Sequence, residues 1–165
     1  MSRAFVKEQD GEPLAHESLD LPQSPHPNLV TPSGLKQLEK RLAAFEAERA
    51  RLHAGERLED RPHLERVERE IRYHKARLET AQLVDLREQP RDRVAFGATV
   101  TVEDDEGKRH DYRIVGEDEA DPDKGLVSYV SPLARALADA QVGDLVTWRR
   151  PAGDLELEIV SIRYA

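Results

Sequence analysis

Residues 53–63 read HAGERLEDRPH, and this stretch decides how the N-terminal half of the chain folds. Between Gly55 and Pro62 stand three carboxylates, those of Glu56, Glu59 and Asp60. Glycine often adopts the left-handed conformation that ends a helix, and proline suits the first turn of the next one. We therefore expect one helix to end at Gly55 and a second to begin near Pro62, with Asp60 or Arg61 as its cap.

Apolar side chains recur at intervals of three and four on both sides of this turn. Before it they are Leu35, Leu38, Leu42, Phe45 and Leu52, with Arg49 at the one charged position; after it they are Leu64, Val67, Ile71, His74, Leu78 and Ala81. Such a pattern is typical of coiled-coil packing. Folding the segments antiparallel places Phe45 opposite Ile71 and Leu42 opposite a partly exposed His74. The sequence thus predicts a helical hairpin over residues 30–86 with its tip near residues 55–61.

The segments next to the hairpin have a different composition. Residues 1–29 are rich in proline and lack periodicity, which predicts a disordered tail. Thr31 or Ser33 is expected to cap the first helix, with Pro32 in its first turn. Residues 87–92 are expected to form a linker.

Alternating strand patterns begin after the linker. The stretches RVAFGATVTVED and RHDYRIVGE flank a DEGK turn, and three further strands are expected downstream. Between them, SPLARALADA predicts a short helix capped by Ser131 with Pro132 at its first position. Residues 93–165 are therefore expected to form a small antiparallel sheet of about five strands with one helix, which makes the chain an α+β protein.

Composition narrows the function classes. The net charge is −8, from 25 basic and 33 acidic residues, which disfavours unaided binding to duplex DNA. The chain has no cysteine and no apolar run of membrane-spanning length, so we expect a cytoplasmic protein with no membrane contact. No phosphate-binding loop, nucleophile elbow or Cys–His set is present, so a self-contained enzyme is not expected.

Several motifs resemble a known family. The stretches FGATVTV, YRIVGEDEAD, SPLARAL, VGDLV and PAGDLELEIVSI, with VTPSGLKQL and AQLVD at the two ends of the hairpin, resemble the bacterial Gre transcript-cleavage factors, GreA and GreB, in order and spacing. The resemblance covers residues 30–165. It implies an accessory factor whose FKBP-like C-terminal domain docks on RNA polymerase and whose hairpin enters the secondary channel, near the RNA 3′ end. We expect the chain to be a monomer.

The resemblance also implies roles for particular residues. The family's tip motif is Gly-Asp-x-x-Glu-Asn, whose two carboxylates help to hold a second Mg²⁺ for cleavage of backtracked RNA. Gly55, Glu56 and Glu59 stand at the matching positions, so Glu56 and Glu59 are the candidate catalytic acids. No metal is expected to bind the chain alone; a Mg²⁺ ion would be shared with the polymerase. The expected polymerase-binding residues are Tyr129, Val130, Ser131 and Pro132.

Three departures from the family pattern leave alternatives open. Glu56 replaces an aspartate, and EDRPH (residues 59–63) stands where the family has ENADY, so that Asp60 replaces an asparagine and the expected small and aromatic residues are absent. The hairpin is also shorter by about 15 residues, which draws the tip back by about 11 Å. One alternative is therefore a non-catalytic regulator of the Rnk type, which binds polymerase and competes with other channel factors. Another is that the acids form only a polar turn, with Asp60 as a helix cap. A prolyl isomerase is suggested only by the FKBP-like fold.

Overall fold

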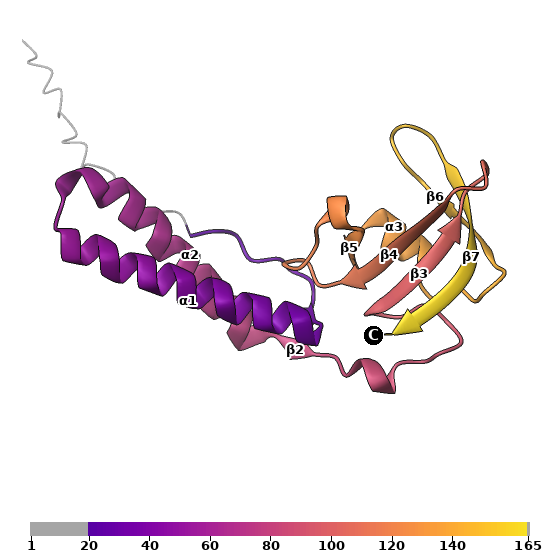
Figure 1. Ribbon diagram of the computed structural model, residues 1–165, viewed down its shortest axis with the longest axis horizontal. Coiled ribbons are helices and arrows are strands. Elements are labelled where there is room, and N and C mark those ends of the chain that lie inside the picture. The colour runs from indigo at the N-terminus through magenta and orange to yellow at the C-terminus, as the bar shows by residue number, and fades with distance from the viewer. Residues whose placement is uncertain (1–19, 165) are drawn as a thin grey trace, which may run out of the picture.

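The protein consists of a helical hairpin that projects from a curled β-sheet domain (Figure 1). This computed structural model describes residues 20–164. The α+β class predicted from the sequence is confirmed, since two long helices precede a five-stranded sheet that carries one short helix. Within the described residues, neither long helix is apolar enough to cross a membrane.

The hairpin is built from α1 (Pro32–Gly55) and α2 (Arg61–Thr80), joined through a short 3₁₀ helix, η1 (Leu58–Asp60). Thr31 caps α1, because its hydroxyl accepts a hydrogen bond from the Gly34 amide at 3.0 Å. The two helices run antiparallel (Figure 1), and His63 Nε2 on α2 lies 2.7 Å from Glu48 Oε1 on α1. The turn therefore lies where the sequence predicted it, between residues 55 and 61.

The seam between the helices is narrow. Its buried side chains include Leu38, Val67, Ile71 and His74. The ring of Phe45, predicted to face Ile71, contacts His74 with the ring centroids 5.3 Å apart. The prediction of a partly exposed His74 is wrong: Nδ1 of this residue lies 2.7 Å from the Glu70 carbonyl oxygen of its own helix, and this local partner allows the imidazole to be buried.

The segment before α1 was predicted to belong to a disordered tail, but residues 20–29 have a defined course. They run along α2 toward the sheet domain (Figure 1), and Asp20 Oδ1 accepts a hydrogen bond from Arg72 Nε at 2.6 Å. Strand β1 (Leu29–Val30) then pairs in parallel with β2 (Gln82–Leu83), directly after α2. The segment has too few apolar residues to pack on itself, and these contacts with α2 and β2 hold it in place. Residues 1–19, the rest of the predicted tail, lie outside the described residues.

The sheet domain follows a short linker that contains η2 (Leu86–Glu88). Its strands are β3 (Ala98–Glu103), β4 (Arg109–Val115), β5 (Leu126–Ser128), β6 (Leu145–Trp148) and β7 (Leu155–Tyr164), in the order β5-β4-β3-β7-β6. Contrary to the expectation of a purely antiparallel sheet, β5 pairs in parallel with β4, because the chain crosses back through the loop that contains η3 (Pro122–Lys124) before β5 begins.

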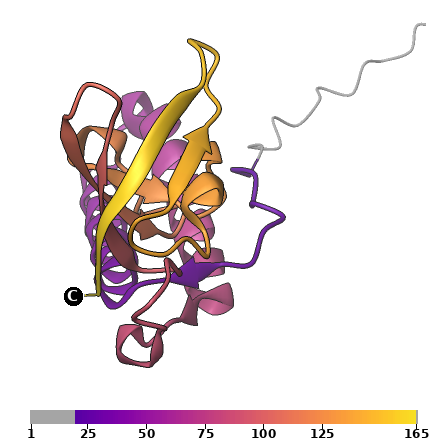
Figure 2. The same cartoon turned by 90° about the vertical axis from the view of Figure 1, so that its right-hand side faces the viewer.

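The core lies between the sheet and α3 (Pro132–Leu137), which Ser131 caps as predicted. Alternate residues of β3 point into it, among them Val100 and Val102, and Leu137 and Leu157 meet them from α3 and β7. Figure 2 shows the long strand β7 crossing the front of the domain, with the hairpin behind it. The sheet curls so strongly that Tyr112 on β4 reaches Trp148 on the edge strand β6, although β3 and β7 lie between these two strands.

Candidate functional site

The end of the hairpin turns on Glu56 itself. Gly55 is the last residue of α1, and Glu56 adopts the left-handed conformation with φ 46° and ψ 34°. The prediction that Gly55 takes this conformation is therefore wrong by one residue: the left-handed position falls after the last helical residue, not on it. A residue with a Cβ pays roughly 1–2 kcal/mol for this conformation. The Glu56 side chain in this strained turn is exposed.

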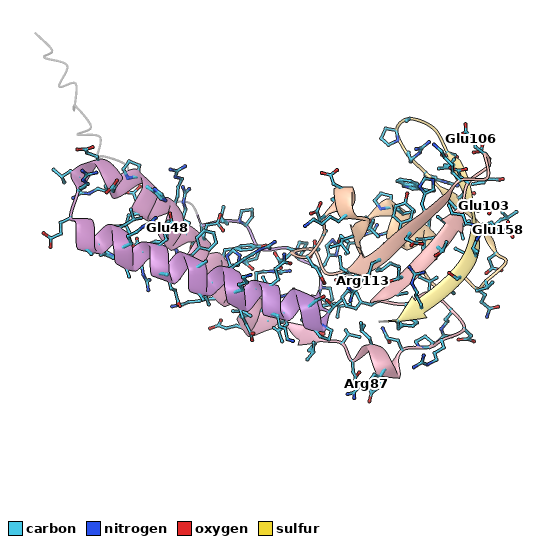
Figure 3. All side chains as sticks on the ribbon, in the orientation of Figure 1. Glu48, Arg87, Glu103, Glu106, Arg113 and Glu158 are labelled. Carbon is cyan, nitrogen blue, oxygen red and sulfur yellow. The ribbon has the colours of Figure 1, made fainter. Side chains whose placement is uncertain are left out.

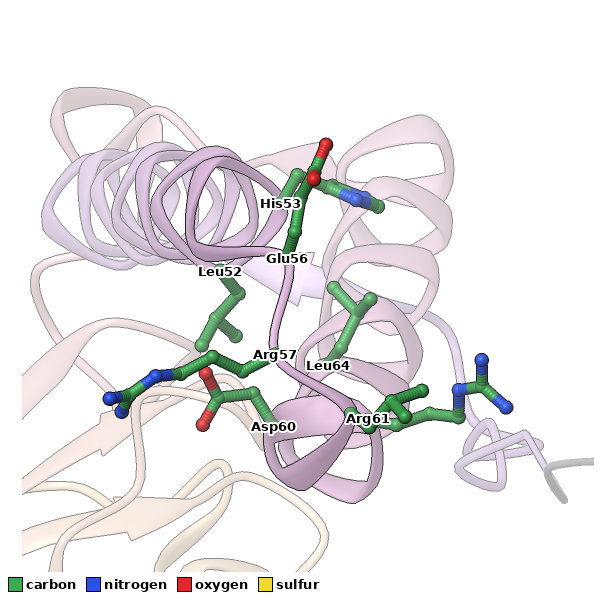
Figure 4. Close-up of a pocket in the computed structure, with 8 residues that line it drawn as sticks. Leu52, His53, Glu56, Arg57, Asp60, Arg61 and Leu64 are labelled. Atoms are coloured by element: carbon green, nitrogen blue, oxygen red, sulfur yellow. The ribbon is translucent and has the colours of Figure 1, made fainter.

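The predicted acids do not converge on one point. Figure 4 shows the Glu56 carboxylate on the same side of the connector as His53, whereas the Asp60 carboxylate lies beside Arg57 on the other side. Glu59, in η1, is exposed. Within residues 20–164, no group of three or more histidine, aspartate or glutamate side chains is arranged to hold a metal ion. The tip therefore presents separate carboxylates, not a formed metal centre.

Asp60 precedes α2 but does not cap it. Its backbone is already helical, with φ −85° and ψ −4°, and its side chain makes no capping hydrogen bond. A capping side chain normally belongs to an extended residue, from which it reaches back to the first amide groups. Because η1 leads directly into α2, this geometry is lost, and the predicted capping role of Asp60 is wrong.

A small hollow of about 290 Å³ lies between the two helix ends (Figure 4). Leu52 and Leu64 line it from the two helices, and Arg57 and Arg61 stand at its margin. At the very end of the hairpin, Leu58 is 77% exposed. The two histidines that flank the tip, His53 and His63, each approach a glutamate of the opposite helix. The tip thus combines acids, arginines and one exposed leucine.

A second surface lies on the sheet domain, at the opposite end of the molecule. A mostly apolar groove of about 730 Å³ opens beside the start of α3. The rings of Tyr112 and Trp148 form one side of it, packed edge to face with centroids 6.3 Å apart, and the Arg150 guanidinium lies 5.2 Å from the Trp148 ring. The remaining walls come from Ala120, Pro122, Leu126, Val127, Ser128, Ser131, Pro132, Leu133, Arg149, Pro151 and Ala152.

The groove separates the four residues predicted to bind polymerase. Ser131 and Pro132 line it, whereas Tyr129 packs edge to face on Phe96 and donates a hydrogen bond to the Pro27 carbonyl. Val130 is half-buried and does not line the groove. The predicted set is therefore brought together only in part.

Sequence reasoning missed the aromatic wall of the groove. Tyr112 and Trp148 alternate with exposed residues along β4 and β6, which is the pattern of ordinary core positions. Nothing local distinguishes them, because their contact depends on the curl of the whole sheet.

Comparison with known proteins identifies relatives for most of the chain. The family model described as Transcription elongation factor, GreA/GreB, C-term matches residues 89–164. The transcription elongation factor GreA of Alkalilimnicola ehrlichii is 48% identical over 101 residues, which cover 60% of this chain and 64% of that protein. The GreA of Desulfovibrio desulfuricans is 34% identical over 150 residues, which cover 82% of this chain and 93% of that protein.

A solved structure with a similar description is the transcription elongation factor GreA/GreB from Nitrosomonas europaea. It is 22% identical to this chain, covers 82% of it and 98% of its own length, and superposes with a TM-score of 0.42. The alignments with the first three curated relatives span only 63–64% of the length of those proteins.

Proposed function

Since the chain belongs to the GreA/GreB family of transcription elongation factors, we propose that it binds bacterial RNA polymerase and acts on elongation through its hairpin tip. The observation that carries this proposal is the separation of two surfaces. The aromatic groove lies on the sheet domain, and the exposed acids lie at the far end of the hairpin. Figure 1 shows how far the hairpin projects from the sheet domain. With 24 residues, α1 spans about 36 Å. One end can hold a partner while the other acts at a distance.

Docking is assigned to the groove. Protein interfaces draw most of their binding energy from a few buried aromatic and arginine side chains, and Tyr112, Trp148 and Arg150 form such a cluster. Ser131 and Pro132 contribute to the same groove. Arg149 and Arg150 at its margin favour a polymerase segment that combines an apolar side chain with carboxylates.

The action at the tip is assigned to stimulation of RNA cleavage in backtracked complexes. Mg²⁺ prefers one or two carboxylates together with phosphate and water, and the exposed Glu56 and Glu59 side chains offer such oxygens. When bound, a second metal ion stabilises the attacking and leaving oxygens of phosphoryl transfer. In this proposal the chain is an accessory factor: it adds carboxylates to an ion that the polymerase and the RNA also hold.

The proposal also includes contact with the RNA, and the location and oligomeric state of the factor. Arg57 and Arg61 stand beside the acids, where guanidinium groups can pair with phosphates near the RNA 3′ end. Because the hairpin is short for the family, the factor has to seat deeply for its tip to arrive there. We take it to work as a cytoplasmic monomer, with one groove and one tip per polymerase.

A cleavage assay on halted, backtracked polymerase tests the proposal. We expect short 3′ RNA fragments when the protein is added, and their loss with Glu56→Gln/Glu59→Gln. The matched control is Glu106→Gln, which alters an exposed glutamate in the β3–β4 turn, far from the tip (Figure 3). Binding without cleavage by the unaltered protein would contradict the role of the acids, and failure to bind polymerase would contradict the proposal as a whole.

A further inference from the structure

Three consecutive acidic residues connect the sheet domain to the base of the hairpin. Glu117, Asp118 and Glu119 follow β4, and each bonds a different segment. Glu117 accepts a hydrogen bond from Ser24 at 2.9 Å, Asp118 bonds α2, and Glu119 bonds the beginning of α1. Asp118 and Glu119, together with their partners around the base of the hairpin, form a cluster that we call the joint. The joint consists of Asn28, Thr31, Arg77, Asp118 and Glu119.

Arg77 is the centre of the joint. Its side chain is only 3% exposed, and Nε donates to Asp118 Oδ2 at 2.6 Å. Its Nη2 donates to Asn28 Oδ1 at 2.7 Å, and the Asn28 amide in turn donates to the Arg77 carbonyl at 2.7 Å. The hydroxyl of Tyr73, one turn earlier on α2, donates to the other Asp118 oxygen. One guanidinium therefore ties together α2, the segment before α1 and the sheet domain.

Glu119 holds the beginning of α1 in the same way. Its two carboxylate oxygens accept hydrogen bonds from Thr31 and from Ser33, the latter at 2.8 Å. Thr31 is also the cap of α1, so the residue that begins the helix is itself bonded to the sheet domain. The direction of α1 is thereby linked to the position of the loop after β4.

Two glycines allow the parts to approach this closely. A Cβ at Gly34 would stand 2.8 Å from Glu119 Oε1, and a Cβ at Gly116 would stand 2.3 Å from the Leu29 carbonyl oxygen. The second contact is with backbone, which cannot move aside as a flexible side chain can. Both helix base and sheet domain are therefore shaped for one relative placement.

A buried ion pair contributes little net stability, because desolvation offsets much of its attraction. Its main effect here is to fix the direction in which the hairpin leaves the sheet domain. Direction matters here because the hairpin is a lever. A rotation of roughly 10° at the base displaces the end of a helix of this length by about 6 Å. Catalytic groups must be placed to within about 0.5 Å, so even a small loosening of the joint would misplace the tip.

We infer that Asn28, Arg77, Asp118 and Glu119 are positioning residues, which fix the angle between the hairpin and the docking groove so that the tip reaches a defined place once the groove is occupied. This inference rests on the proposed function for its purpose, but the fixed angle itself is a property of the free protein. The two can therefore be tested separately.

The angle can be measured with spin labels, because the chain contains no cysteine that would need to be removed. Leu58→Cys at the tip and Lys124→Cys in η3 place labels at two exposed positions. Dipolar spectroscopy on the otherwise unaltered protein should give one narrow distance distribution. Arg77→Met should broaden it or move its centre by about 5 Å or more, and Arg77→Lys should fall between the two because it keeps the charge but loses the fork.

Arg87→Met is the matched control, since Arg87 pairs with Asp85 on the exposed surface of the linker (Figure 3). This variant should leave the distribution unchanged. If Arg77→Met does not fold, Glu119→Gln, which keeps the shape of the side chain and removes its charge, decides the question. A folded Arg77→Met or Glu119→Gln protein with the narrow distribution of the unaltered protein overturns the inference.

The effect of the same variants on polymerase tests whether the joint matters for function. With a loosened joint, the concentration that gives half-maximal effect should change by less than about threefold, because the groove is intact, whereas the maximal effect should fall by about tenfold or more. Arg77→Lys should restore part of it. If the unaltered protein has no effect on polymerase, the proposed function fails, and the label distances still decide whether the joint sets the angle. Equal losses in binding and in maximal effect would overturn the positioning role.

Discussion

The Arg77 guanidinium on α2 and the Asp118 carboxylate after β4 form a buried ion pair, with 2.6 Å between Nε and Oδ2. Removing one partner leaves the other charged and buried. We therefore expect Asp118→Ala to lower the free energy of unfolding by about 3 kcal/mol. Urea denaturation followed by circular dichroism measures this directly.

The control for this prediction is an exposed pair. Asp111 bonds Arg163 at 3.1 Å on the open face of the sheet, and Asp111→Ala should cost less than about 1 kcal/mol. If the two variants lose similar amounts of unfolding free energy, the burial of Asp118 does not increase its contribution to stability.

Thr31 combines two roles, since it caps α1 and donates to Glu119. Thr31→Ala should lower the free energy of unfolding by about 2 kcal/mol, because a lost cap typically costs about 1 kcal/mol and Glu119 also loses a partner. Thr31→Ser keeps the hydroxyl and should stay within about 0.5 kcal/mol of the original protein. The prediction fails if both substitutions are equally costly in a denaturation series.

Tyr73 should make stability depend on alkaline pH. Burial and the hydrogen bond to Asp118 raise the pKa of Tyr73 from 10.0 to about 12. The neutral phenol is thus favoured in the folded state, so its contribution is complete below pH 10 and is lost as pH rises from 10 to about 12. In Tyr73→Phe this loss is absent.

The stability difference between the original protein and Tyr73→Phe should therefore shrink as pH rises. Midpoints of urea unfolding at pH 8 and at about pH 11.5 give the comparison. A difference that is the same at both pH values would contradict the shifted pKa of Tyr73.

The backbone of Glu56 is strained, because its φ of 46° lies in the left-handed region. Glycine has no Cβ penalty there but is more flexible when unfolded, so Glu56→Gly should raise the free energy of unfolding by about 0.5–1 kcal/mol. Glu59→Gly lies in the 3₁₀ helix η1 and should be neutral or destabilising. Thermal unfolding of the two variants distinguishes them, and a destabilised Glu56→Gly would refute the strain.

The groove gives the fifth prediction, which rests on the proposed function. Trp148→Ala removes the aromatic wall and the site over which Arg150 lies, and should weaken polymerase binding by tenfold or more. Val142→Ser changes an exposed apolar residue that does not line the groove and should bind normally. Equilibrium binding of folded variants to polymerase provides the measurement; unchanged affinity for Trp148→Ala would place the docking surface elsewhere.

Local patterns were sufficient for the outline of the fold. The spacing of apolar residues around Gly55 located both helices and the tip. Residue type and position identified Ser131 as a cap and narrowed the cap of α1 to Thr31 or Ser33, between which the structure selects Thr31. Alternation from residue 93 onward predicted the five strands. These features depend on neighbours within a few positions, so the sequence by itself determined them.

Tertiary structure decided how these parts work together. Only the folded chain shows that Glu56, not Gly55, takes the left-handed turn, and that residues 20–29 lie against α2. The burial of Arg77 and the meeting of Tyr112 with Trp148 arise between segments far apart in sequence. Such contacts depend on which surfaces the curled sheet and the hairpin base bring together, and no local periodicity encodes that.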